Sequence, residues 1–240
     1  VVIGNGSSEI FDMIYRVFLR EGDEVIQQTP CFGIYKLRCD LYGGKVVSVP
    51  MEYKDKQMVY DPEGIVKAVT NKTKVIVIAN PNNPTGNFMD EKEFVRIAEL
   101  GIPFIIDEAY IEYAGLKKSL SRLIKKFKNV IVTRTMSKAY GLAGLRFGYL
   151  LADKEVAMKI AATLLPWNVG TITMWAALTA LEDQKGLGIL KIEEYTRLFG
   201  LGEEIPEVPF FSHEGVVPNP EWKKEKFEEK NTDLFSLLQS

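Results

Sequence analysis

The stretch Lys74–Gly86 reads K-V-I-V-I-A-N-P-N-N-P-T-G and contains two different signals. Its first six residues, Lys74–Ala79, are mostly apolar and β-branched, which predicts a strand buried on both faces. The seven residues that follow hold two prolines and a glycine, which restrict the backbone of a loop. They also hold three asparagines, whose amides can donate to a ligand. A stiff turn without a ligand is the alternative interpretation, but so dense a run of restricted and amide residues favours a binding loop.

Strand-like and helix-like segments alternate on both sides of this stretch. Further strands are expected at Val1–Ile3, Glu24–Ile26, Lys45–Val49, Phe104–Ile106 and Val130–Val132. Helices are expected after Gly4–Ser8, from the N-cap Asp61, from the N-cap Asp90 to about Leu100, from Asp153, and over Thr171–Leu181. The first helix places Ile10, Met13, Ile14, Val17 and Phe18 on one face. This alternation predicts an α/β fold with a mostly parallel central sheet flanked by helices.

The composition argues against several classes of protein. With a net charge of −2, the chain offers no electrostatic argument for binding nucleic acid or membrane. Its longest apolar runs are strand-sized, and none approaches the roughly 20 residues of a membrane helix. Cys31 and Cys39 are the only cysteines, and the absence of a secretory signal favours a reducing, cytoplasmic compartment. The single histidine, His213, argues against histidine-rich metal sites, and no metal is predicted.

The two ends of the chain differ from its middle. The chain has no initiator methionine and Val1–Ile3 resembles the middle of a strand, so we expect it to begin partway through a larger protein. Regular patterning predicts one domain over residues 1–183. Prolines and charges interrupt the pattern over residues 184–240, which stay unassigned, and the charged run Glu221–Lys230 is expected to be a solvated helix or tail.

A glycine-rich segment follows the first predicted strand. Gly4-Asn5-Gly6-Ser7-Ser8-Glu9 turns into a helix, and the backbone N–H groups at a helix start favour a phosphate. A tight turn with a serine N-cap explains the same residues, so both interpretations stay open for this segment alone.

Charged residues follow two other predicted strands. Asp107 ends the strand Phe104–Ile106, and a carboxylate in that position needs a cationic or hydrogen-bonding partner. Lys138 and Arg146 lie in a glycine-containing loop after Val130–Val132, and such a pair suits a phosphate and a carbonyl. Lys138 alone would be interpreted as a surface lysine. Because ligands of parallel sheets bind at the carboxyl ends of the strands, these loops together predict one site.

Taken together, these segments resemble the fold-type I aminotransferases that use pyridoxal 5′-phosphate (PLP), in particular the histidinol-phosphate aminotransferase group. The similar segments are Gly4–Glu9, Pro30–Tyr35, Asn80–Gly86, Asp107–Tyr110, Ser137–Tyr149 and Leu165–Val169. The resemblance covers roughly residues 1–183. It implies the PLP-binding large domain of such an enzyme, with the small domain missing or unrecognised in this chain.

The resemblance implies roles around the cofactor ring. Lys138 would form the Schiff base with the cofactor aldehyde and then move a proton at the substrate Cα. Asp107 would pair with the ring nitrogen and keep it protonated. Tyr110 would donate to the phenolic oxygen of the ring, which Asn83 would share. Phe32 would stack on the ring, although a core aromatic is the alternative for this residue.

The resemblance also implies a phosphate site and a reaction. The phosphate ligands would be the backbone of Gly6, Ser7 and Ser8, the hydroxyls of Thr135 and Ser137, and the guanidinium of Arg146. The reaction would be transamination in histidine biosynthesis by a cytoplasmic homodimer. The amino donor would be an amino acid or amino-alcohol phosphate, with histidinol phosphate favoured, and the 2-oxo acid acceptor would be 2-oxoglutarate. Arg197 does not match the family arginine that binds a substrate carboxylate, and no residue is assigned to that role.

Several alternatives remain. A threonine-phosphate decarboxylase or an aromatic aminotransferase would share the fold and most of these residues. A non-catalytic fragment or binding protein is the alternative of another class. A dinucleotide-binding loop would need glycine where Glu9 stands, and a hydrolase would need serine in place of Thr135.

Overall fold

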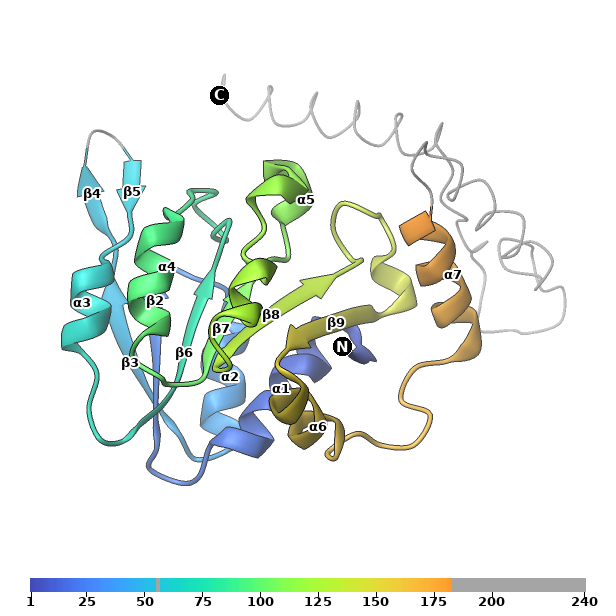
Figure 1. Cartoon of the computed structure of the whole chain (residues 1–240), viewed down its shortest axis with the longest axis horizontal. Helices are drawn as coiled ribbons and strands as arrows, with labels where there is room; N and C mark the ends of the chain where they lie inside the picture. The colour runs from blue at the N-terminus through green and yellow to red at the C-terminus, as the bar shows by residue number, and fades with distance from the viewer. Residues whose placement is uncertain (55–56, 183–240) are drawn as a thin grey trace, which may run out of the picture. The chain divides into compact units, whose positions relative to one another are not determined.

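A seven-stranded sheet forms the centre of the compact unit Val1–Gly170 in the computed structural model, which describes residues 1–54 and 57–182 (Figure 1). The strand order is β1 (Val2–Asn5), β9 (Phe147–Ala152), β8 (Val130–Thr135), β7 (Phe104–Asp107), β6 (Thr73–Ala79), β2 (Glu24–Thr29) and β3 (Lys45–Pro50). Within this sheet β9 is antiparallel to both of its neighbours, and all the other pairs are parallel. The predicted mostly parallel sheet is therefore confirmed.

Two layers of helices cover the sheet. One face packs against α1 (Gly6–Phe18), α2 (Ile34–Leu41) and α6 (Lys154–Ala161). The other face packs against α3 (Pro62–Lys67), α4 (Glu91–Ala98) and the 3-10 helix η2 (Ser121–Lys125). Along β6, Val75 and Val77 point into the first layer while Ile76 and Ile78 point into the second, so this strand is buried on both faces as predicted.

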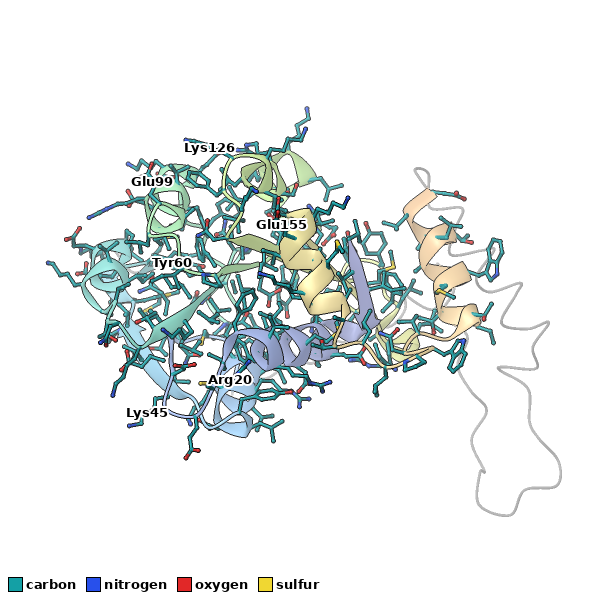
Figure 2. The ribbon with its side chains drawn as sticks, turned by 60° about the horizontal axis from the view of Figure 1, so that its bottom comes forward. Arg20, Lys45, Tyr60, Glu99, Lys126 and Glu155 are labelled. Carbon is teal, nitrogen blue, oxygen red and sulfur yellow. The ribbon has the colours of Figure 1, made fainter. Side chains whose placement is uncertain are left out.

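Short elements complete the unit. They are the hairpin strands β4 (Glu52–Lys54) and β5 (Gln57–Val59), the short helix α5 (Ile111–Ala114), and the 3-10 helices η1 (Leu116–Lys118) and η3 (Ala143–Leu145). Figure 2 shows Tyr60 in the interior, whereas charged side chains such as Arg20 and Lys45 lie at the periphery.

The register of the sheet brings the ends of distant strands together. Ala79 is opposite Asp107, and Asp107 is opposite Thr133, so β6 and β7 end at the same level while β8 continues to Thr135. On the far side of β8, Thr135 is opposite Gly148 of β9. The loops that follow β6, β7 and β8 therefore leave from one edge, which is where parallel sheets bind their ligands.

The predicted helix caps have different outcomes. Asp61 caps α3 by accepting from Gly64 N at 2.8 Å, and Asp153 Oδ1 accepts from Glu155 N at 3.0 Å at the start of α6. Asp90 occupies the predicted N-cap position of α4 (Glu91–Ala98), but its side chain makes no cap hydrogen bond. Asp90 is exposed, so water can solvate its carboxylate in place of the helix N–H groups. Helix α2 and strand β9 were not predicted.

Two expectations concern parts of the chain outside this unit. A second unit begins at Thr171, and its described part is helix α7 (Thr171–Glu182), close to the predicted Thr171–Leu181. The segment 184–240, with His213, Arg197 and the charged run at 221–230, lies outside the described residues, so the predicted boundary at residue 183 stays a prediction.

Of the helices that the structure describes, none is long and apolar enough to cross a bilayer. Within the same ranges, no three His, Cys, Asp or Glu side chains are grouped as metal ligands.

Candidate functional site

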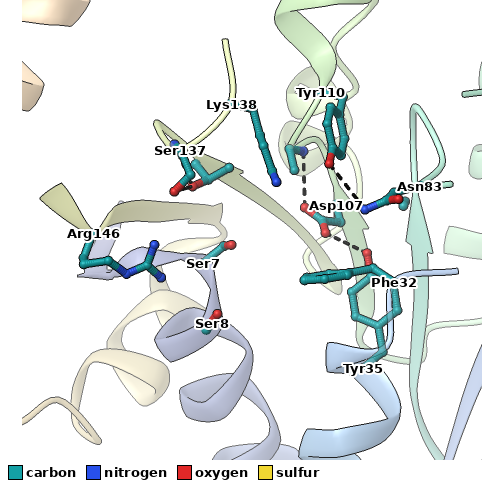
Figure 3. A pocket seen from close by; sticks show the side chains of 13 residues that line it. Ser7, Ser8, Phe32, Tyr35, Asn83, Asp107, Tyr110, Ser137, Lys138 and Arg146 are labelled. Atoms are coloured by element: carbon teal, nitrogen blue, oxygen red, sulfur yellow. Dashed lines mark hydrogen bonds between the residues drawn. The ribbon is translucent and has the colours of Figure 1, made fainter. Parts of the chain in front are cut away.

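A cavity of about 190 Å³ lies at the edge where β6, β7 and β8 end, beside the start of α1 (Figure 3). Ten of the eleven predicted site residues line it, and they are Ser7, Ser8, Phe32, Asn83, Asp107, Tyr110, Thr135, Ser137, Lys138 and Arg146. The eleventh, Gly6, adjoins the Arg146 guanidinium. Tyr35, Ala79 and Ala109 line the cavity as well and were not predicted.

Asp107 is a buried carboxylate at the floor of this cavity, with 3% of its surface exposed. Its Oδ2 accepts from Tyr35 Oη at 2.6 Å, and its Oδ1 accepts from Thr133 Oγ1 at 3.0 Å and from Ala109 N at 3.2 Å. Burial raises the pKa of Asp107, while these three donors act in the opposite direction. No described cation pairs with Asp107, so the carboxylate suits a cationic group that enters the cavity.

Lys138 and Tyr110 form the upper wall. Figure 3 shows the Lys138 side chain pointing into the cavity. Its Nζ lies 5.4 Å from the centroid of the Tyr110 ring. Asn83 Nδ2 donates to Tyr110 Oη at 3.3 Å, which joins the loop after β6 to the loop after β7. The cavity therefore presents an amine and a phenol-amide pair close to the buried carboxylate.

The opposite wall is suited to an anion. Ser7 and Ser8 lie in the first turn of α1, where backbone N–H groups have no partner within the helix. Gly6 has φ +74°, and a Cβ there would overlap the guanidinium of Arg146, with its Cζ only 3.0 Å away. The backbone of Arg146 also lies in the left-handed region, with φ 53°. In the described part of the chain, Arg146 Nη1 donates to Ala143 O at 3.1 Å, so Nη2 and Nε can bind an incoming anion.

The Thr135 hydroxyl is engaged in contacts within the protein. Thr135 is buried, and its Oγ1 contacts Phe147 O at 3.3 Å and Ser137 Oγ at 3.0 Å and accepts from Ser137 N at 3.1 Å. These bonds stay within the β8–β9 region, so Thr135 orients the loop that carries Ser137 and Lys138.

Phe32 stands at the mouth of the cavity. It is 42% exposed, and its ring meets the Tyr35 ring edge-on at 6.0 Å between centroids. The alternative interpretation of Phe32 as a core aromatic is therefore wrong. Tyr35 follows Phe32 by three residues, which is about one helical turn and was the available signal for its place in the site.

A buried ion pair supports the site from the other face of the sheet. Glu108 accepts from Arg134 Nε at 3.0 Å and Nη2 at 2.9 Å, and also from Leu120 N at 2.6 Å and Ser119 Oγ at 2.9 Å. Glu108 follows Asp107, and Arg134 precedes Thr135. The pair therefore ties together the ends of β7 and β8 that carry the cavity residues.

Solved structures with the same arrangement define the class of protein. A histidinol-phosphate aminotransferase from Sinorhizobium meliloti, solved in complex with pyridoxal-5′-phosphate, matches with a TM-score of 0.70 and 29% identity, over 84% of this chain and 56% of that chain. An L-threonine-O-3-phosphate decarboxylase from Porphyromonas gingivalis matches with a TM-score of 0.65 and 26% identity, over 82% and 57% of the two chains. The fold is that of the PLP-dependent transferases.

Sequence similarity then identifies the family. The model for aminotransferase class I and II matches residues 1–197, and the chain belongs to this family of PLP-dependent enzymes. A histidinol-phosphate aminotransferase from Thermococcus gammatolerans is 41% identical over 181 residues, which are 75% of this chain and 51% of that protein. The chain spans about half the length of the curated relatives it matches. The predicted resemblance and cofactor are confirmed, and family membership decides against the dinucleotide-binding and hydrolase alternatives.

Proposed function

We propose that this chain supplies the PLP-binding part of an aminotransferase that moves an amino group from histidinol phosphate to 2-oxoglutarate. The observation that carries the proposal is the cavity itself, which the Lys138, Asp107 and Arg146 side chains all line. The donor is supported by relatives between 33% and 41% identical that are named histidinol-phosphate aminotransferases.

The anionic end of the cofactor would bind at the α1 side. Arg146 and the first-turn N–H groups of Ser7 and Ser8 provide positive charge and donors for a phosphate, and the Ser137 hydroxyl adds another donor. Gly6 leaves the space that the Arg146 guanidinium occupies, so a larger residue at position 6 would displace it.

The ring would lie between Phe32 and the end of β7. Asp107 would hold a proton on the ring nitrogen, while Tyr110 and Asn83 would donate to the ring oxygen. Bound PLP supplies the electron sink that stabilises negative charge at the substrate Cα. Lys138 would bind the cofactor aldehyde and then remove and return the proton at that carbon.

Covalent trapping tests the cofactor assignment. The purified chain is incubated with PLP and reduced with borohydride, and the modified peptide is identified by mass spectrometry. We expect the label on Lys138 and none in Lys138→Ala. Lys118→Ala is the matched control, because Lys118 Nζ also lies 5.4 Å from an aromatic centroid, that of Phe88, but outside the cavity. A label that persists in Lys138→Ala would contradict the assignment. An unlabelled wild-type chain would favour the non-catalytic alternative.

Product analysis tests the reaction. The loaded protein is offered histidinol phosphate, phosphothreonine or an aromatic amino acid, with 2-oxoglutarate present, and glutamate and CO₂ are measured. We expect glutamate with histidinol phosphate. Release of CO₂ from phosphothreonine would instead support the decarboxylase, which the similarity to the Porphyromonas gingivalis structure keeps as the second candidate.

The proposal includes a homodimer. Leu165 and Trp167 are 67% and 94% exposed, and such large apolar side chains on a surface are typical of contact sites between chains. Analytical ultracentrifugation should show twice the mass of one chain, and a Trp167→Ala variant should weaken the association.

A further inference from the structure

Tyr35 makes the shortest hydrogen bond to the buried carboxylate of the site. Its Oη lies 2.6 Å from Asp107 Oδ2, whereas Thr133 and Ala109 serve the other oxygen, Oδ1. Tyr35 is therefore the donor that the described part of the chain supplies to Oδ2. The two residues are 72 positions apart, and the contact joins α2 to the end of β7.

The hydroxyl of Tyr35 is held in a fixed place. The side chain is fully buried, and its ring packs against Phe11 at 5.1 Å and against Phe32 at 6.0 Å between centroids. Burial, followed by the neighbouring Asp107 charge, raises the pKa of Tyr35 well above its usual value, so the phenol stays protonated and acts as a donor. Donation to an ionised acceptor is stronger than donation to a neutral one, so this bond favours the charged form of Asp107.

We propose that Tyr35 is a positioning residue whose hydroxyl orients Asp107 and keeps it ionised against the ring nitrogen of PLP. The inference rests on the proposed cofactor site. With PLP bound, one proton would be shared between its ring nitrogen and the Asp107 carboxylate. With the proton on nitrogen, the pair is a pyridinium and a carboxylate, and with the proton on Asp107, it is a neutral ring and a carboxylic acid. The Tyr35 donor stabilises the first arrangement, in which the ring withdraws electrons from the substrate.

A neighbouring tyrosine provides a matched control. Tyr15 of α1 is also fully buried in the same hydrophobic cluster, and its pKa is also raised by burial. Its hydroxyl has no hydrogen-bond partner among the residues that the structure describes. Tyr15→Phe therefore removes an equally buried hydroxyl without removing a donor from Asp107.

The experiment measures PLP affinity and the protonation of the ring nitrogen. PLP labelled with ¹⁵N in the ring is titrated into the wild-type chain and into Tyr35→Phe, Tyr15→Phe, Asp107→Asn and the double variant of positions 35 and 107. We expect Tyr35→Phe to weaken PLP binding about tenfold, the size of one hydrogen bond to a charged group, and to move the ¹⁵N resonance towards that of a neutral pyridine. Tyr15→Phe should match the wild type. In the Asp107→Asn background, Tyr35→Phe should no longer change PLP affinity or the ¹⁵N resonance.

The outcomes separate this inference from the proposed function. A wild-type chain that binds no PLP would overturn both. Binding by the wild type, with Tyr35→Phe equal to Tyr15→Phe or with an unchanged effect in the Asp107→Asn background, would overturn this inference alone. If phenylalanine at position 35 prevents folding, a fluorotyrosine placed there keeps the ring and strengthens the donor. It should move the ¹⁵N resonance further towards pyridinium, and no movement would overturn the inference.

Discussion

Replacing Gly148 with alanine should disturb the anion-binding wall through a direct backbone contact. A Cβ at position 148 would lie 2.6 Å from the carbonyl carbon of Gly6 and closer still to the nitrogen of Ser7. Non-bonded carbon atoms normally stay about 3.5–4.0 Å apart, so the start of α1 or strand β9 must move by about 1 Å. Both neighbours are backbone atoms, which cannot rotate away as a flexible side chain would.

Gly148→Ala should lower both the free energy of unfolding and the PLP affinity. Overpacking of this kind lowers the free energy of unfolding by about 1–3 kcal/mol. A shift of about 1 Å in a binding group can reduce its effect about 100-fold, so PLP affinity should fall more than stability alone explains.

Urea unfolding and PLP titration measure both quantities, with Gly144→Ala as the matched control. Gly144 lies in the same region of the chain, and a Cβ there would have no atom within 4 Å. We expect Gly144→Ala to bind PLP like the wild type. If Gly148→Ala equals Gly144→Ala in unfolding free energy and in PLP affinity, the close approach of β9 to α1 does not constrain the site.

Two further changes test the buried charges. Burial raises the pKa of Asp107 above its usual 3.8, so the folded chain holds this proton where the unfolded chain has lost it, and stability falls as pH rises from about 3.8 through the folded pKa. Without PLP, Asp107→Asn should therefore gain stability relative to the wild type between pH 4 and pH 7 in urea titrations, and a difference independent of pH would argue against this. Arg134→Met should lower the unfolding free energy by about 3–5 kcal/mol, because Glu108 is left buried without its cation. Arg122→Met, which breaks an exposed pair with Glu91, should lower it by about 1 kcal/mol or less, and equal losses would contradict the burial argument.

Local patterns predicted most of the elements and the edge where the site lies, but missed helix α2 and strand β9. The β-branched residues Val75–Ile78 are buried on both faces, as expected for four such residues in a row with no polar residue to face water. Polar residues directly after predicted strands were enough to bring Asn83, Asp107 and Lys138 into one cavity, since parallel strands end at one edge.

What the sequence by itself determined was therefore the kind of sheet, the edge used for binding and most of the residues around the cavity. Tertiary structure alone decided which groups meet inside it. The bond from Tyr35 to Asp107, the pairing of Glu108 with Arg134 and the approach of Gly148 to Ser7 each join different elements. Such contacts depend on strand register and helix packing to within about 1 Å, and no local propensity encodes them.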